Sequence, residues 1–255
     1  MANIVYMARS AWTNLLDTIR SKASVSGTMT VSQATTAVEN IPSGGDDERF
    51  KKRIEGTISV ASGHDVTRVA SFAFMRCNSL TAVDFPNVTT IGSSAFFSCS
   101  KLQTVNFQNV TYIGQEAFKS CNSLQTISFP NATSIQGSAF VSCKITEANF
   151  PKVSIISNNA FSACSSLSTA SFPAATSING YAFTDCIRLL SLYLLGSSIP
   201  YLQATTAFNT TPISSTTSAT GGVYGSIFVP ASLYNSYLTA TNWSRYSSRI
   251  VSVAE

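Results

Sequence analysis

Apolar positions recur along this chain with a period of about 22 residues between residues 64 and 195. Each period contains Leu-x-x-Val-x-Phe, then Val-x-x-Ile, then Ala-Phe-x-x-Cys, with mostly Ser, Thr and Asn between these positions. Self-similarity at a period of roughly 20 to 50 residues is typical of solenoids, in which each repeat forms one turn of a stack. The pattern therefore predicts a repeat solenoid of about six 22-residue turns.

Each repeat has two parts. In the second full copy, Val105 and Phe107 alternate with polar residues, which is typical of a β-strand. The part that follows, from Val110 to Cys121, turns the chain back along the opposite wall. Strands that recur once per turn lie side by side in the same direction, so we expect a parallel β-sheet on one face.

One phenylalanine and one cysteine per turn are predicted to line the interior, because both recur at the same place in every copy. This structural core comprises Phe74, Phe96, Phe118, Phe140, Phe161 and Phe183, with Cys77, Cys99, Cys121, Cys143, Cys164 and Cys186. Six cysteines also permit three disulfides. Since the repeat places one sulfur per turn on the same wall, we expect six buried free thiols instead.

The cysteines are separated by 22, 22, 22, 21 and 22 residues, so one turn is a residue shorter than the others. The missing residue falls in Cys143-Lys144-Ile145, in the turn before a predicted strand. Loops tolerate such changes. The inward positions on either side are therefore expected to keep their register.

Residues that flank the inward strand positions are predicted to face outward. They form two rows, which are Asp84, Asn106, Ser128, Asn149, Ser171 and Tyr193, and Ala82, Thr104, Thr126, Glu147, Thr169 and Ser191. These rows are either a solvated, β-favouring surface or a broad polar face for a ligand. A second candidate ligand site is a group of C-terminal aromatics, Tyr224, Tyr234, Tyr237 and Tyr246. Packing inside a cap is the alternative for such aromatics and the favoured one for Trp243.

The segments that flank the repeats predict four regions. Residues 1–45 contain two short helical patterns and a linker, and residues 46–63 hold a charged connector and an N-terminal cap with a strand at residues 56–60. Residues 64–195 form the array and residues 196–255 a C-terminal α+β cap. The first helix carries Trp12, Leu15, Leu16 and Ile19 at helical spacing, and a short amphipathic helix of this kind needs a partner surface.

Composition excludes several function classes. Only 11% of the residues are charged and the net charge is +4, without the clustered basic face of nucleic-acid-binding proteins. No apolar run is long enough to span a membrane. Residues 1–20 lack the apolar core of a secretory signal peptide, so no Sec-type export signal is expected there. With His64 as the sole histidine and no Cys-x-x-Cys pair, we expect no metal, no cofactor and no enzyme activity.

The pattern Leu-x-x-Val-x-Phe-Pro-x-Val-x-x-Ile-x-x-x-Ala-Phe-x-x-Cys, in six copies, closely resembles the BspA-like leucine-rich repeat. The resemblance implies a right-handed leucine-rich-repeat stack, and its members are commonly bacterial surface or host-contact proteins. The tail, with Val229-Pro230 followed by Tyr, Trp and Ile residues, resembles the terminus that closes such arrays.

Residues 15–41 resemble N-terminal pieces of phage tail and fibre proteins. This resemblance implies a virion protein that leaves the cell by lysis. It would be attached to the particle through residues 1–45, would be homo-oligomeric, and would present the array to a host surface protein or glycan. The alternatives are a BspA-like adhesion or protein-interaction protein at the bacterial surface or in the cytoplasm, and a glycan-targeting accessory module.

Overall fold

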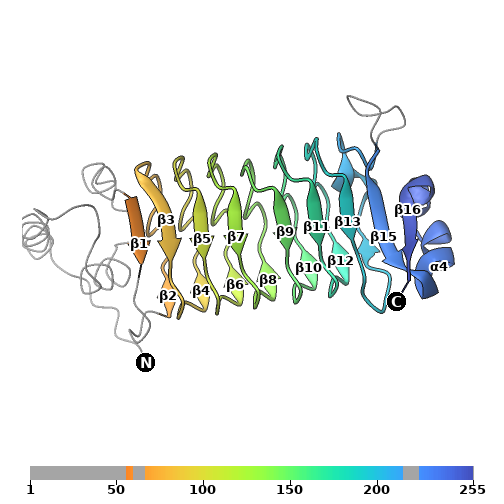
Figure 1. The fold of residues 1–255 in the computed structure, drawn as a ribbon, viewed down its shortest axis with the longest axis horizontal. Helices are drawn as coiled ribbons and strands as arrows, with labels where there is room; N and C mark the ends of the chain where they lie inside the picture. The colour runs from red at the N-terminus through yellow and green to blue at the C-terminus, as the bar shows by residue number, and fades with distance from the viewer. Residues whose placement is uncertain (1–55, 60–66, 215–223, 255) are drawn as a thin grey trace, which may run out of the picture.

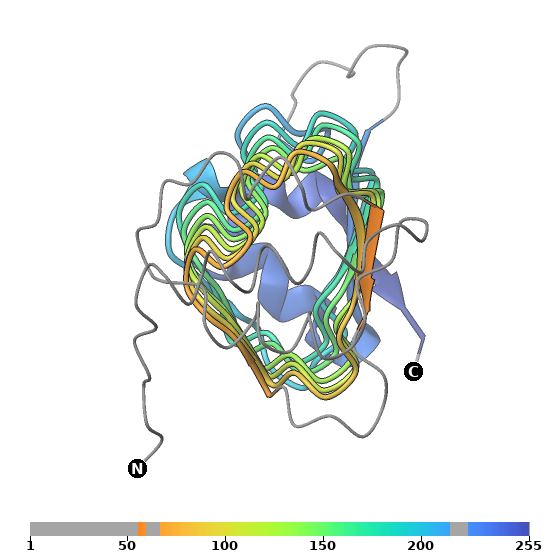
Figure 2. The same cartoon turned by 90° about the vertical axis from the view of Figure 1, so that its left-hand side faces the viewer.

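The chain forms a stack of similar turns that is closed at one end by a helical cap (Figure 1). The computed structural model describes residues 56–59, 67–214 and 224–254. Viewed along the stack, the turns overlie one another around a common interior (Figure 2). The predicted repeat solenoid is therefore confirmed. The predicted helices of residues 1–45 lie outside the described residues.

The front wall of the stack carries parallel strands, one per turn. The first sheet pairs β1 (Gly56–Ser59), β3 (Leu80–Asp84), β5 (Thr104–Asn106) and β7 (Thr126–Ser128). The second pairs β9 (Glu147–Asn149), β11 (Thr169–Ser171), β13 (Ser191–Tyr193), β15 (Ser226–Pro230) and β16 (Ile250–Val253). The strand expected over residues 56–60 is confirmed as β1, which covers the first edge.

The back wall carries a further parallel sheet, which the sequence did not reveal. Its strands are β2 (Arg68–Val69), β4 (Thr90–Ile91), β6 (Tyr112–Ile113), β8 (Ser134–Ile135), β10 (Ile155–Ile156), β12 (Ser177–Ile178) and β14 (Tyr201–Leu202). Each has two residues, which is too short for alternation to be visible in the sequence. The strands pair because the repeat brings the same position of every turn into register.

The front sheet is interrupted at the one short repeat. Within the described residues, no strand pairing joins β7 to β9, although β8 and β10 remain paired on the back wall through Ile135 and Ile156. The interior register is kept, as predicted, because Phe129 and Phe150 still stack at 6.1 Å across the same place. The one-residue deletion therefore interrupts the strand pairing of the front wall, while the packing of the core continues across it.

Two columns of phenylalanine rings run through the interior. In the first column, which starts at Phe74 and ends at Phe208, successive rings stack 5.1–5.7 Å apart and are nearly parallel. The second comprises Phe85, Phe107, Phe129, Phe150 and Phe172. All these rings are buried. Since complete burial of a phenylalanine stabilises a fold by about 1.5–3 kcal/mol, both columns contribute to the stability of the stack.

Backbone segments of successive turns approach closely at Gly92. A Cβ atom there would lie 2.4 Å from the backbone nitrogen of Ser71, so a larger residue does not fit without moving the backbone. A similar approach at Gly114, where a Cβ atom would lie 2.6 Å from the carbonyl carbon of Gly92, accounts for the glycine that follows the back-wall isoleucine in these two repeats.

The stacking continues beyond residue 195, where the regular sequence rhythm ends. A 3-10 helix at Thr205–Phe208 follows β14, and Phe208 stacks on Phe183 at 5.7 Å. Thr211 occupies the place of the cysteine in this turn and is buried.

The chain then forms β15, a 3-10 helix at Ala231–Leu233, α4 (Tyr234–Thr239), a 3-10 helix at Ser244–Arg249 and β16. The predicted C-terminal α+β cap is therefore confirmed.

Candidate binding surfaces

The outward side chains of the front sheet lie in the two predicted rows. Strand pairing places Asp84 beside Asn106 and Asn106 beside Ser128, and beyond the break it places Asn149, Ser171 and Tyr193 side by side. The other row runs through Thr104 and Thr126, then Glu147, Thr169 and Ser191. All these side chains are exposed or half-buried. The break divides each row between β7 and β9.

Hydrogen bonds connect the N-terminal part of one row. Asn106 Nδ2 donates to Asp84 Oδ1 at 3.0 Å, and Gln108 Nε2 donates to Asn106 Oδ1 and, at 3.3 Å, to Ser128 Oγ. These bonds fix the orientation of the amide and carboxylate groups before any ligand arrives. A surface ordered in this way loses little side-chain entropy on binding.

The same row becomes apolar over the last three strands. Tyr193 lies beside Phe228, and Phe228 lies beside Val251. The rings of Tyr193 and Phe228 stack at 4.6 Å with an angle of 13° between their planes. Sequence reasoning found Tyr193 alone, because β15 and β16 come after the regular repeat and their register with it was not visible.

A cation–aromatic pair borders this apolar region. The guanidinium carbon of Arg249, which directly precedes β16, lies 3.8 Å from the ring centroid of Tyr224. Tyr224 is 42% exposed. Of the four predicted C-terminal aromatics, Tyr224 is thus the one whose ring is openly at the surface.

The other three predicted C-terminal aromatics pack within the cap. Tyr237 and Tyr246 are buried, so their proposed role in contacting a ligand is corrected to a structural one. Tyr246 donates a hydrogen bond to the carbonyl oxygen of Thr205 at 2.7 Å, and burial raises its pKa to about 12. Tyr234 is half-buried and packs against the core. Trp243, expected to pack in the cap, donates from Nε1 to the carbonyl oxygen of Pro200 at 2.8 Å.

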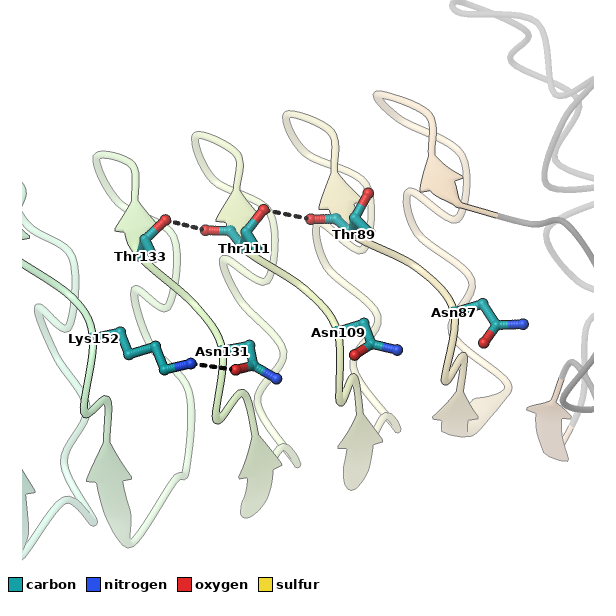
Figure 3. Close-up of a pocket in the computed structure, with 7 residues that line it drawn as sticks. All are labelled: Asn87, Thr89, Asn109, Thr111, Asn131, Thr133 and Lys152. Carbon is teal, nitrogen blue, oxygen red and sulfur yellow. Dashed lines mark hydrogen bonds between the residues drawn. The ribbon is translucent and has the colours of Figure 1, made fainter.

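A shallow groove of about 400 Å³ lies on the wall between the front and back sheets, as Figure 3 shows. It is lined by a threonine row and a second row that ends in a lysine, namely Thr89, Thr111 and Thr133, and Asn87, Asn109, Asn131 and Lys152. This surface was not predicted from the sequence, because its residues belong to no strand pattern.

Backbone hydrogen bonds explain the residue types of this groove. Thr133 Oγ1 donates to the carbonyl oxygen of Thr111 at 3.1 Å, one turn earlier, and Asn131 Nδ2 donates to the carbonyl oxygen of Gln108 at 2.8 Å. Lys152 Nζ donates to Asn131 Oδ1 at 2.6 Å. The Asn-x-Thr sequence of these repeats therefore joins successive turns, and the groove needs no ligand to account for it.

None of the six cysteines forms a disulfide, and all six thiols are buried. From Cys99 onward, each Sγ donates to the carbonyl oxygen of a phenylalanine in the preceding turn, at 2.9–3.1 Å. Burial raises the pKa of the Cys164 thiol from 9.0 to about 12, and it raises the pKa values of Cys99, Cys143 and Cys186 well above 9.0. Neutral, enclosed thiols are poor nucleophiles, so these cysteines do not form a reactive site.

The described ranges contain no group of three or more His, Cys, Asp or Glu residues placed to hold a metal ion. No helix in those ranges is both long and apolar enough to span a membrane. The predicted attachment residues Trp12, Leu15, Leu16 and Ile19, like His64, lie outside the described residues.

A family model for the BspA-type leucine-rich repeat region, with six copies, matches residues 47–168 and 154–221. The chain belongs to the BspA-type leucine-rich repeat family. Folds of this family are generally non-enzymatic and mediate protein interactions. The matched region includes the first front sheet, the back sheet, and strands β9, β11 and β13 of the second front sheet. No curated protein matches the chain.

A solved leucine-rich repeat protein shares the fold. A leucine-rich cell surface protein from Faecalibacterium prausnitzii aligns with a TM-score of 0.52 and 23% identity, over 69% of this chain and 64% of that one. The aligned part is thus less than two thirds of that protein. A leucine-rich repeat protein from Bacteroides ovatus aligns with a TM-score of 0.46 and 24% identity, over 69% of this chain and 54% of that one.

Proposed function

We propose that this BspA-type chain is a non-enzymatic recognition protein displayed at a bacterial cell surface, with the front sheet as its binding face. The observation that carries the proposal is the pair of outward rows, which repeat polar groups in register from strand to strand. Solenoids bind partners along such extended surfaces. The cell-surface location draws support from the printed description of the F. prausnitzii protein.

The phage resemblance of the N-terminal segment stays a prediction. It falls on residues outside the described ranges, and the comparisons support a leucine-rich repeat protein without supporting a virion. The adhesion or protein-interaction alternative therefore takes precedence over the virion interpretation.

Blocking the front sheet tests the proposed function. The full chain, labelled with biotin, is applied to purified extracellular-matrix proteins, to intact host cells and to a glycan array. Thr104→Arg, Thr126→Arg and Thr169→Arg together place long charged side chains along one outward row. We expect this triple variant to lose at least about tenfold in affinity for whichever probe the native chain binds.

The matched control also introduces three arginines, but on the back wall. Thr90→Arg, Ser134→Arg and Ser177→Arg occupy the outward positions of β4, β8 and β12. Affinity should be retained in this control, and both variants should unfold at the native temperature. Equal loss in the two variants, or binding by the native chain to none of the probes, would reject the front sheet as the recognition surface.

A further inference from the structure

The outward positions of the back wall alternate between large and small side chains. Each back-wall strand contributes one outward residue, and strand pairing sets these residues in a line along the stack. The large side chains of this line are exposed and the small ones are half-buried. We call it the back-wall row, and in chain order it reads Arg68, Thr90, Tyr112, Ser134, Ile155, Ser177 and Tyr201.

The alternation has a period of two turns, which the 22-residue repeat of the core does not impose. Neighbouring strands of a sheet lie about 4.8 Å apart, so Tyr112, Ile155 and Tyr201 recur at intervals of about 9.6 Å. The turns overlie one another when viewed along the stack, so these three residues lie close to a straight line (Figure 2). Tyr112 is 40% exposed, Ile155 is 48% exposed and Tyr201 is 63% exposed. The row therefore presents three evenly spaced apolar anchors.

The small positions between these anchors are polar and ordered. Ser134 Oγ accepts a hydrogen bond from Gln136 Nε2 at 2.7 Å, and Ser177 Oγ donates to Asn179 Oδ1 at 2.9 Å. The hydroxyl groups are thus held in place before a ligand arrives, which lowers the entropy cost of binding. The outward residues of β4 to β14 are all uncharged. This wall therefore suits an uncharged ligand with hydroxyl groups and apolar faces.

We propose that the back-wall row binds a flat β-1,4-linked glucan chain of the cellulose type. Successive sugars in such a chain are rotated by half a turn, so the same ring face recurs at every second sugar, over a length close to two strand spacings. The sugar faces carry C–H groups, which the negative face of a tyrosine ring attracts. Tyr112, Ile155 and Tyr201 then contact every second sugar. The inference goes beyond the proposed function, because it concerns the opposite wall.

Other polymers fit this row less well. Two residues of an extended peptide span about 6.6–6.8 Å, and one turn of an α-helix spans about 5.4 Å. Either would place apolar side chains over Ser134 and Ser177 instead of over the anchors alone. Nucleic acids and anionic membranes require clustered positive charge, and the row carries a single charged residue, Arg68. The spacing and the lack of charge together favour a neutral polysaccharide.

Binding of the full chain to microcrystalline cellulose, measured by depletion from solution, tests the inference. Tyr112→Ser and Tyr201→Ser should each weaken binding at least about tenfold. Tyr201→Phe should retain native affinity, because it keeps the ring face. Added salt should have no effect on affinity, since no charge pair is formed. Tyr224→Ser is the matched control, because Tyr224 is 42% exposed and lies outside the row, and it should bind like the native chain.

A double variant tests the spacing itself. Ser177→Tyr combined with Tyr201→Ser moves one anchor to the neighbouring turn and keeps the number of exposed tyrosines. It should bind cellulose as weakly as Tyr201→Ser alone. Native affinity in the double variant, no binding of the native chain to cellulose, equal binding to starch, whose α-linked chains coil, or binding to chitin alone would overturn the inference. So would weaker binding of Tyr201→Ser to a protein probe, since the row would then contact protein.

The two proposals fail separately, because a cellulose fibre is not among the probes of the front sheet. The back-wall variant with Thr90→Arg, Ser134→Arg and Ser177→Arg should lose cellulose binding and keep the front-sheet probe, and the front-sheet variant should do the reverse. If the native chain binds a front-sheet probe but no cellulose, the proposed function stands and this inference is wrong. If it binds cellulose through the row and none of the front-sheet probes, the inference stands alone.

Discussion

At the scale of single residues, the thiol of each internal repeat links two turns. Cys121 Sγ, for example, donates to the carbonyl oxygen of Phe96 at 3.1 Å. The bond needs the protonated sulfur, and burial stabilises the same form by raising the pKa of the thiol. Cysteine thus contributes a small buried volume together with a donor that joins successive turns.

The raised pKa values of the buried thiols predict that the folded chain becomes less stable at alkaline pH. The pKa of Cys164 is about 12 in the folded chain, against 9.0 for an unperturbed thiol. Below pH 9 both states keep the proton and the stabilisation is fully present. Above pH 9 the unfolded chain loses protons first, so the free energy of unfolding falls by up to about 1.4 kcal/mol per pH unit for each such thiol. Urea unfolding measured across this pH range checks the expected decline.

Cys164→Ala separates the thiol effect from general alkaline damage. At neutral pH the variant should be less stable than the native chain, because it leaves a small cavity and loses the hydrogen bond from Cys164 Sγ to the carbonyl oxygen of Phe140. Above pH 9 its stability should fall less steeply with pH than that of the native chain. An identical slope in both proteins would contradict the assignment to this cysteine.

At the scale of elements, the front sheet is two sheets joined by a shared core. The amides of Phe107 and Phe150 donate to carbonyl oxygens of the next turn, Ser128 at 3.2 Å and Ser171 at 3.0 Å. The equivalent amide of Phe129 faces the break between β7 and β9. The ring columns and the back sheet continue past this place, so the interruption is confined to one wall.

Hydrogen exchange should therefore be uneven along the front wall. We expect the Phe129 amide to exchange at least about tenfold faster than the amides of Phe107 and Phe150, because local opening there separates no strand pair. Exchange measured by NMR on the native chain checks this. Adding a serine between Cys143 and Lys144 restores the common repeat length and should slow exchange at Phe129. Uniform protection of all three amides would contradict the break.

The core could be predicted because its residues recur with a strict period. The back-wall strands and the C-terminal part of the outward row could not, because their sequence shows no such repetition. Phe118 and Cys121 recur in a sequence pattern that only a stack explains, so their burial followed from the sequence. The two-residue strands of the back wall carry one inward residue each, which no alternation reveals. The apolar end of the outward row was missed because Phe228 and Val251 join that row only through the strand pairing of β15 and β16. Tyr237 and Tyr246 could not be assigned to core or surface by residue type.

At the scale of the whole molecule, the cap keeps the last turn of the stack from solvent. Trp243 and Tyr246 pack against Phe208, the final ring of the first column. Asn242 Nδ2 donates to the carbonyl oxygen of Leu202 at 2.8 Å, which ties the cap to β14. An uncapped solenoid exposes an apolar end to which other molecules can add.

Trp243→Ala should both destabilise the chain and promote its association. Loss of the buried indole is expected to cost about 3–5 kcal/mol in the free energy of unfolding and to uncover Phe208. Urea unfolding measures the first effect, and light scattering after size-exclusion chromatography at several concentrations measures the second. Arg245→Ala, an exposed change in the same cap, should leave both unchanged. Native stability in the Trp243→Ala chain would show that the cap is dispensable.

The regular placement of one sulfur per turn gives the molecule a built-in set of chemical reporters. A small alkylating reagent reaches each sulfur when its own turn opens, and mass spectrometry distinguishes the six peptides after digestion. The order of modification, from Cys77 to Cys186, then records whether the stack frays from its ends or parts in the middle. The native sequence supports this measurement without introduced probes.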